Sequence, residues 1–284
     1  MCDNLKYTEY DDKTLKHLQN LELMILKDFI KFCDENNLTY YIYAGSMLGA
    51  IRHNGFIPWD DDLDVVMFRD DYERFKKIFL ASPNEKYKLL SNETENDYFH
   101  TLSKLMLKDT LFEEKWVDQV DFHVGINIDI FVLDDLSDNN FKRNYQLKKA
   151  FLYNKLLIMS KIKLDDLPFL TKLITHFGYY VLKLFRVKPS TLHKRCLNFL
   201  MKYKNPDSKH VFDISATAEE YPQIYLKDDF KDIIKVKFED IQVNVPKNYD
   251  NILKSLYGDY MQLPPEEDRY NHITEHLDFG PYVD

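Results

Sequence analysis

The sequence predicts an α+β fold in which a mixed β-sheet is flanked by helices and carries a basic helical insertion. Three observations lead to this prediction. An amphipathic helical pattern over residues 14–35 runs directly into a β-prone segment at residues 40–43. Residues 233–245 alternate between apolar and polar side chains, as a β-hairpin does, whereas residues 141–210 show the apolar spacing of helices. A chain of 284 residues is long enough to bury a full core.

Each element has its own signal. Residues 14–35 repeat Leu, Ile and Phe at steps of three or four until the polar run 34–37, so this helix is expected to cover one face of the sheet. Residues 40–43 form the first expected strand and residues 65–68 the second. The remaining expectations are, in order, a helix over 70–80, short strands over 86–90 and 101–107, a strand over 126–132, a hairpin turn at Glu239-Asp240, and a helix over 249–257 closed by Gly258.

The net charge of −9 is unevenly distributed along the chain. Residues 141–210 contain 16 Lys and Arg against 3 Asp, so the rest of the chain is strongly acidic. Pro168 and Pro189 are expected to divide this basic stretch into separate helices. Cationic, aromatic-rich amphipathic helices can lie in a membrane interface, but a helical subdomain with a solvated lysine face is an equally good interpretation. Nucleic-acid binding is disfavoured because no recognition module accompanies the charge.

Other bulk features exclude several classes of protein. Aromatic residues make up 15% of the chain and it has only 7 Gly, which indicates packed structure rather than disorder. Cys2, Cys33 and Cys196 are too widely spaced for a disulfide framework or a zinc motif, which fits a reducing cytoplasm. Residues 1–14 are polar, so no signal peptide is expected, and no apolar run is long enough to span a membrane. We therefore expect a cytoplasmic location, with peripheral contact to the inner face of the membrane through residues 141–210 as a further hypothesis.

The stretch between the first two expected strands carries the most distinctive chemistry. Gly45-Ser46 is small enough for the backbone to turn and approach a ligand, and four of the five residues 60–64 are Asp. Strand alternation places Asp62 and Asp64 on one face. Two such charges about 4 Å apart repel by about 4 kcal/mol at an effective dielectric constant of about 20, so the pair needs a shared proton, a basic partner or a divalent cation. Hard carboxylate oxygens favour Mg²⁺ (or Mn²⁺); the alternative is a solvated acidic loop.

Three stretches of the sequence closely resemble the LicD/fukutin family of phosphoryl transferases, which belongs to the nucleotidyltransferase superfamily. The resemblance implies a nucleotidyltransferase-like fold in which Asp129, on a later strand, is the third carboxylate beside Asp62 and Asp64. All three would then be catalytic residues and ligands of the Mg²⁺ or Mn²⁺ ion. The matching stretches are residues 45–67, GSMLGAIRHNGFIPWDDDLDVVM, residues 125–135, GINIDIFVLDD, and residues 238–272, which resemble the C-terminal signature of the family.

The resemblance also implies a domain organisation. Residues 1–136 would form the nucleotidyltransferase-like catalytic core, and residues 211–284 would complete it. Residues 137–210 carry no motif of the family and would form the basic helical insertion.

The function that the resemblance implies is metal-dependent transfer of a phospho-alcohol from a CDP-alcohol donor, with release of CMP. CDP-choline is the favoured donor, and the acceptor would be a hydroxyl of a glycan or lipid-linked glycan, such as a cell-surface polysaccharide, teichoic acid or lipopolysaccharide. Gly45 and Ser46 would bind the diphosphate, Asp129 would act as a base or shared metal ligand, and Arg269 or His272 would touch nucleotide or acceptor unless they are merely solvated. Three alternatives stay open. The transferred group could be ribitol or glycerol phosphate, the protein could be a true nucleotidyltransferase that releases pyrophosphate, or it could be a non-enzymatic glycan- or membrane-binding protein.

Four further residues are candidate contacts to substrate. Arg52 is expected either to brace phosphate or to form a structural ion pair with a neighbouring Asp. His53 would act as a second base or stabilise its loop by hydrogen bonding. Trp59 would line a pocket for a quaternary ammonium by cation–π attraction, or pack as a core or lid residue. The family resemblance implies that Lys104 faces substrate phosphate, and a surface position on its strand is the alternative.

Overall fold

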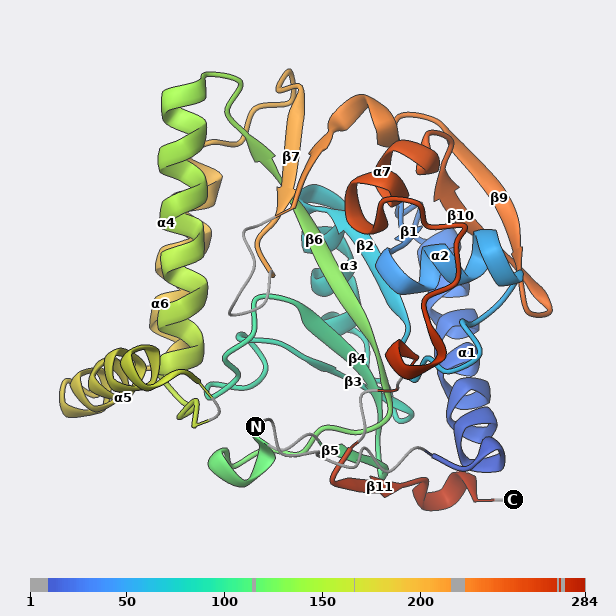
Figure 1. Ribbon diagram of the computed structural model, residues 1–284, viewed down its shortest axis with the longest axis horizontal. Coiled ribbons are helices and arrows are strands. Elements are labelled where there is room, and N and C mark those ends of the chain that lie inside the picture. The colour runs from blue at the N-terminus through green and yellow to red at the C-terminus, as the bar shows by residue number, and fades with distance from the viewer. Residues whose placement is uncertain are drawn as a thin grey trace.

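The centre of the molecule is a seven-stranded sheet in which β2 and β6 run parallel and the other neighbouring strands pair antiparallel. This mixed sheet, flanked by helices, confirms the predicted α+β class (Figure 1). The strand path is β1 (Tyr41–Ile42), β2 (Asp64–Phe68), β6 (Asn127–Leu136), β4 (Ser103–Leu107) and β3 (Tyr87–Leu90), with β7 (His210–Asp213) beside β6 and β8 (Ile224–Leu226) beside β7. The computed structural model describes residues 10–113, 116–165, 167–215, 223–269, 271 and 274–283.

Helices α1 (Asp12–Glu35) and α3 (Arg69–Ala81) pack against the sheet. The first helix begins where the Asp11 side chain accepts hydrogen bonds from the backbone N–H groups of Lys13 and Thr14, which satisfies two of the donors that a helix start leaves unpaired. Its apolar stripe is buried, so the helix predicted over residues 14–35 has the predicted structural role. The stripe includes Leu18, Ile25, Leu26 and Phe29.

A second group of elements gathers beside β1 and β2: α2 (Ala44–His53), the hairpin β9 (Ile233–Phe238) and β10 (Ile241–Pro246), and α7 (Tyr249–Tyr257). The hairpin turns at Glu239-Asp240, as predicted. Helix α7 ends at Gly258, whose φ of +63° is a backbone conformation that favours glycine, so this prediction is also confirmed. The hairpin β9–β10 and helix α7 are thereby packed beside β1 and α2, the two elements that precede the acidic residues 60–64.

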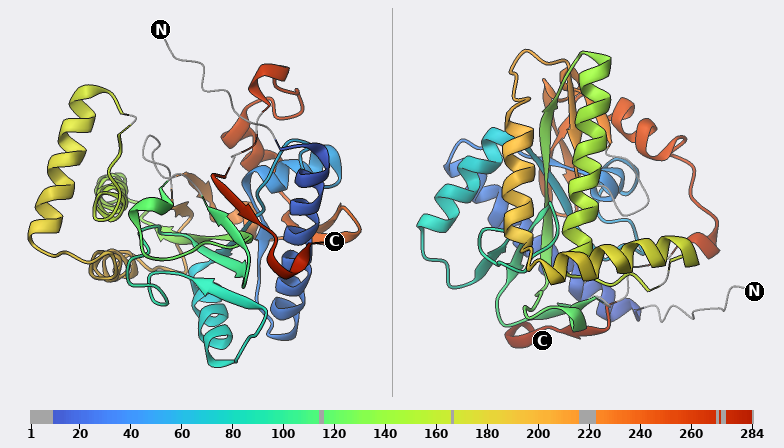
Figure 2. Two further views of the ribbon diagram at one scale, coloured as in Figure 1. Left: turned by 90° about the horizontal axis from the view of Figure 1, so that it is seen from below. Right: turned by 90° about the vertical axis from the view of Figure 1, so that its left-hand side faces the viewer.

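Residues 137–210 contain three helices, α4 (Asn140–Met159), α5 (Phe169–Leu184) and α6 (Pro189–Met201). Helices α4 and α6 pack against each other, and their buried side chains share a separate core cluster with Leu136 and Phe212 of the sheet. As predicted, Pro168 and Pro189 mark the starts of α5 and α6. Helix α5 stands at the edge of the molecule in Figure 1 and in the left view of Figure 2, and it faces the viewer in the right view of Figure 2. The proposed boundaries of this region as an insertion stay a prediction.

Two local features differ from the expectation. The first strand is only two residues long, because Tyr43 already caps the start of α2. A short ladder between β5 (Leu111–Glu113) and β11 (His276–Asp278) joins distant parts of the chain and has no signal in the local sequence pattern. Short 3-10 helices lie at Val117–Gln119, Lys227–Phe230, Glu266–Asp268 and Gly280–Tyr282. Within the described ranges, no helix has the length and apolar character needed to cross a membrane.

Candidate active site

The pairing of β2 with β6 brings two predicted site residues side by side. Asp64 and Asp129 are direct partners in the parallel register, and the backbone N–H of Asp129 donates to the carbonyl of Leu63 over 2.9 Å. Asp64 is buried at 7% exposure, whereas the Asp129 side chain is 18% exposed. Partners in register share a face of the sheet, so the two carboxylates point to the same side. Side chains separated by 65 positions in the sequence therefore meet at one place.

Lys104 supplies the positive charge at this place. It is the register partner of Asp129 on the antiparallel strand β4. Its ammonium group donates to Asp129 Oδ1 over 2.8 Å and to Asn127 Oδ1 over 3.3 Å. The side chain is 9% exposed, so the ion pair is largely shielded from water. The structure thus excludes the alternative that Lys104 is a surface residue of its strand, while contact with substrate phosphate stays a prediction.

The local charge is nevertheless negative. Burial raises the pKa of Asp64 well above its ordinary value, and the charges of Asp62 and Asp129 raise it further, whereas Lys104 opposes them. Asp62 lies in the loop just before β2 and is partly exposed. Its effect on the Asp64 pKa indicates that the two carboxylates lie close enough to repel. Among the described residues, the carboxylates of Asp60, Asp62 and Asp129 act on Asp64 against the ammonium of Lys104, so negative charge predominates around it.

Gly45 and Ser46 lie in the first turn of α2 rather than on an open turn, so the predicted conformation of this pair was wrong. The helix begins directly after Tyr43, whose carbonyl accepts a hydrogen bond from the backbone N–H of Met47, although the Tyr43 side chain makes no capping hydrogen bond. Ser46 Oγ is buried and accepts a hydrogen bond of 2.8 Å from the backbone N–H of Asp64, which ties α2 to β2. Gly45 is constrained by space, since a Cβ atom there would lie 3.2 Å from a carboxylate oxygen of Asp60. A helix start presents unpaired N–H groups, so phosphate binding here is still a chemically reasonable prediction.

Arg52, His53 and Trp59 form one cluster with Arg269. Arg52 donates to His53 Nε2 over 2.9 Å and to the backbone carbonyl of Tyr260 over 2.9 Å. It therefore links α2 to the segment after α7, and among the described residues it forms no ion pair with a neighbouring Asp, which is the alternative to a phosphate contact. Burial lowers the pKa of His53, and the adjacent Arg52 charge lowers it further, so its imidazole favours the neutral form.

The ring of Trp59 already has a cation on it. The guanidinium of Arg269 lies 5.1 Å from the ring centroid, and the imidazole of His53 meets the ring edge-on at 6.2 Å between centroids. Trp59 is predicted to line a pocket for a quaternary ammonium, and in this structure the cation over its ring is Arg269. His272, the other C-terminal candidate, lies outside the described residues.

Glu22 of α1 is a site residue that the sequence reasoning missed. It is 2% exposed, and its Oε2 has no hydrogen-bond partner among the described residues. Burial raises its pKa well above the ordinary value, with further contributions first from Asp62 and then from Asp61, Asp60 and Asp129. Glu22 thus approaches the acidic residues 60–64 from helix α1. A signal was present, because Glu22 lies on the same helical stripe as Leu18 and Ile25, where a carboxylate is out of place.

The donor atoms at this place fit a hard divalent cation. Asp62, Asp64 and Asp129 would hold it through carboxylate oxygens, which Mg²⁺ and Mn²⁺ prefer. The raised pKa of Asp64 and the unbonded buried oxygen of Glu22 are the structural observations that support this fit. In the part of the chain that is described, however, no three Asp, Glu, His or Cys side chains are already arranged as a coordination site. A three-carboxylate metal site therefore stays a prediction.

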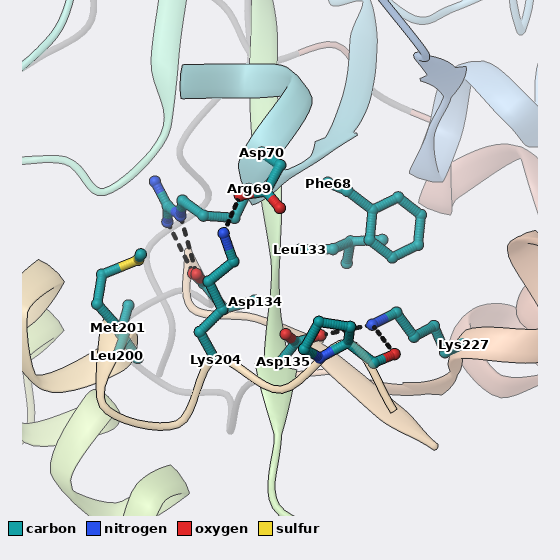
Figure 3. Close-up of a pocket in the computed structure, with 11 residues that line it drawn as sticks. Phe68, Arg69, Asp70, Leu133, Asp134, Asp135, Leu200, Met201, Lys204 and Lys227 are labelled. Carbon is teal, nitrogen blue, oxygen red and sulfur yellow. Dashed lines mark hydrogen bonds and ion pairs between the residues drawn. The ribbon is translucent and has the colours of Figure 1, made fainter. Parts of the chain in front are cut away.

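A different hollow, of about 220 Å³, lies at the other end of β2 and β6. Figure 3 shows that its charged side chains point toward one another. Because these charges neutralise each other, the hollow is best understood as a structural junction between the sheet and the segment after α6. The pairs are Arg69–Asp134 at 2.7 Å, Lys227–Asp135 at 2.8 Å, and Lys204–Asp70.

Comparison with known proteins gives similarity along nearly the whole chain. Residues 37–171 match the family described as LicD/FKTN/FKRP, nucleotidyltransferase domain. The lipopolysaccharide cholinephosphotransferase LicD of Haemophilus influenzae is 31% identical over 271 residues, which cover 92% of this chain and 97% of that protein. An uncharacterised protein of Rickettsia typhi is 36% identical over 69 residues, or 24% of this chain and 22% of that protein. One of Rickettsia prowazekii is 41% identical over 54 residues, or 19% of this chain and 20% of that protein.

Proposed function

Because this chain belongs to the LicD/FKTN/FKRP family, we propose that it transfers a phospho-alcohol from a CDP-alcohol to a hydroxyl of a cell-surface glycan and releases CMP. The first candidate donor is CDP-choline and the first candidate acceptor is lipopolysaccharide, since the relative from Haemophilus influenzae is described as a lipopolysaccharide cholinephosphotransferase. The observation that carries the proposal is the in-register pair Asp64 and Asp129 beside Lys104. Teichoic acid is an alternative acceptor, and ribitol or glycerol phosphate are alternative transferred groups.

In the proposed reaction, an acceptor hydroxyl attacks the phosphorus that carries the alcohol. A new P–O bond forms to the acceptor, the bond to the CMP phosphate breaks, and the hydroxyl proton passes to Asp129 as the candidate base. Mg²⁺ or Mn²⁺ held by Asp62, Asp64 and Asp129 would supply positive charge for the diphosphate when bound. The backbone N–H groups at Gly45 and Ser46 would bond phosphate oxygens at the start of α2.

Lys104 and Ser46 have positioning roles in this proposal. The Lys104 ammonium holds one oxygen of Asp129 at 2.8 Å and so fixes the orientation of that carboxylate. The Ser46 hydroxyl holds the backbone of Asp64, which sets α2 and its N–H groups against the acidic strand. Both contacts are buried, so neither side chain has to be ordered when substrate binds.

The test is to incubate the protein with Mg²⁺ and a panel of CDP-choline, CDP-ribitol, CDP-glycerol and CTP, with lipopolysaccharide or teichoic acid as acceptor. Chromatography would identify the released nucleotide. We expect acceptor-dependent CMP release from CDP-choline, and no release with Asp64→Asn. Pyrophosphate release from CTP would instead identify a nucleotidyltransferase. A protein that binds glycan but releases neither product would be the non-enzymatic alternative.

A further inference from the structure

Helix α5 presents an apolar face that the fold does not cover. None of its 16 residues is buried. Its large apolar side chains recur at helical spacing on one side, as in Phe169, Leu173 and Phe177, so they form a single continuous face. These side chains are each more than half exposed: Phe169, Leu170, Leu173, Ile174, Phe177, Tyr180 and Leu184, followed by Phe185 just after the helix. We call this set the α5 apolar face.

The opposite side of α5 is held by the rest of the protein. A Cβ atom at Gly178 would lie 3.0 Å from the sulfur of Met159, so α5 approaches the end of α4 closely. The ammonium of Lys163 lies over the ring of Tyr179, at 5.3 Å from its centroid. Figure 2 shows α5 projecting from the body of the molecule. The α5 apolar face is therefore directed outward by packing on its back.

Basic residues lie beside the α5 apolar face. Lys183, Arg186 and Lys188 are exposed at the C-terminal end of α5, and Lys172 lies one turn from its start. Asp165 pairs with Lys172 over 2.9 Å, but the whole stretch 141–210 keeps its excess of Lys and Arg. A surface that combines exposed rings with cations complements anionic lipid headgroups above acyl chains. Two copies of the same cationic surface would repel, which disfavours self-association through this face.

We propose that α5 docks the protein on an anionic lipid bilayer, with the α5 apolar face in the headgroup–acyl boundary and its cations among the headgroups. The helix lies on the bilayer rather than across it, because 16 residues span only about 24 Å against a hydrocarbon core of about 30 Å. Docking does not require the transferase activity. If the proposed function holds, docking also places the enzyme on the surface that contains a lipid-linked acceptor.

The experiment is co-sedimentation of the full chain with phosphatidylcholine vesicles, with or without phosphatidylglycerol. We expect binding that requires phosphatidylglycerol and weakens as salt is added. Phe177→Asp should lower the partition coefficient by at least about tenfold, and Leu173→Asp with Phe177→Asp should abolish binding. Leu80→Asp is the matched control, since Leu80 is an exposed apolar residue at the end of α3 and should bind as the unchanged chain does.

Two further measurements keep the result interpretable. Thermal unfolding should show the same midpoint for the α5 variants, because the substituted side chains are exposed. CMP release with a water-soluble acceptor should also be unchanged, so a failure of docking and a failure of the proposed function would be separate observations. The proposal is overturned if the unchanged chain ignores anionic vesicles, if Phe177→Asp binds as well as Leu80→Asp, or if light scattering without lipid shows a dimer that Phe177→Asp dissociates.

Discussion

The two ends of the β2–β6 strand pair hold their acidic side chains in opposite electrostatic settings. At the far end, Arg69 donates to both carboxylate oxygens of Asp134, over 2.8 and 2.7 Å, and Lys227 pairs with Asp135. At the near end, Asp64 and Asp129 stand next to each other, and among the described residues the ammonium of Lys104 pairs with Asp129. Both ends are built from the same two strands, so the difference lies in the partners that other elements bring.

This difference separates a structural use of charge from a functional one. A buried carboxylate with a bidentate guanidinium is neutralised within the fold, and removing one partner leaves the other buried and unpaired. A surplus of carboxylates costs stability in the ligand-free protein, as the raised pKa of Asp64 indicates. Such a surplus is expected where a cationic ligand completes the site. The near end is therefore the end at which substitutions should affect chemistry more than folding.

The largest expected effect is that substitutions at the near end lower activity, whereas substitutions at the far end lower stability. Asp62→Ala or Asp64→Ala should lower CMP release at least about a thousandfold, or about 4 kcal/mol of activation free energy, because the diphosphate loses its counter-charge. The free energy of unfolding should be unchanged or higher, since a repulsive charge is removed. Activity is measured by CMP release and stability by urea unfolding.

Asp134→Ala is the matched control at the far end. It leaves the buried Arg69 with Glu73, at 3.2 Å, as its remaining carboxylate partner, and it should lower the free energy of unfolding by about 3 kcal/mol. The folded fraction should keep its specific activity, because Asp134 lies at the opposite end of the strand pair. If Asp64→Ala unfolds the protein while Asp134→Ala leaves stability unchanged, the distinction between the two ends is wrong.

A smaller effect should follow from adding a divalent cation. Mg²⁺ or Mn²⁺ that binds only the folded chain should add about 2.7 kcal/mol of stability at a concentration one hundred times its Kd, and raise the thermal midpoint by several degrees. Asp64→Asn should lose this increase, while Asp134→Ala should keep it despite its lower starting midpoint. Calorimetric titration gives the same comparison as heat of binding. An equal cation response in both variants would place the cation elsewhere.

A feature of this site could be predicted where it depends on residues that are neighbours in the sequence, and not where it depends on contacts between distant segments. The apolar run 65–68 is a local signal that predicts the extended conformation of β2, but Asp62, which was expected on the same strand as Asp64, lies in the loop before it. The pairing of Lys104 with Asp129 depends on the register between β4 and β6, which no local pattern sets. The contact of Arg269 with Trp59 is likewise made by the folding of the C-terminal segment onto the core. Arg269 and Trp59 are 210 positions apart, so their contact cannot be predicted from the sequence around either residue.

Two residues show that local patterns can also mislead. Gly45-Ser46 is expected on a turn because both residues are small, but the pair lies in the first turn of α2, where Ser46 Oγ accepts a hydrogen bond from the backbone N–H of Asp64. Glu22 was overlooked because the helix 14–35 was interpreted by its apolar residues alone. In both cases a tertiary contact decides the role of a residue whose local context allows another.

The smallest expected effect concerns Asp213, a carboxylate near the far end that forms no ion pair with a cation among the described residues. Among its hydrogen-bond donors are the backbone N–H of Ser215, over 2.8 Å, the Ser215 hydroxyl and the side chain of Tyr43. Burial raises its pKa from the ordinary 3.8 to about 6, although these hydrogen bonds act in the opposite direction. The folded chain thus binds this proton more tightly than the unfolded chain does. Stability from this group is complete at low pH and decreases as the pH rises from about 4 to about 6.

Asp213→Asn should remove this dependence, because an amide does not ionise and its oxygen can still accept from Ser215. Relative to the unchanged chain, the variant should gain about 2 kcal/mol of unfolding free energy between about pH 4 and about pH 6, measured by urea unfolding at each pH. Asp64→Asn, measured in parallel, accounts for the near-end carboxylate whose raised pKa acts in the same direction. A constant difference between Asp213→Asn and the unchanged chain across this range would mean that Asp213 is ionised in the fold. The far end would then hold a buried charge without a cation, so pairing of charges would not be what distinguishes the far end from the near end.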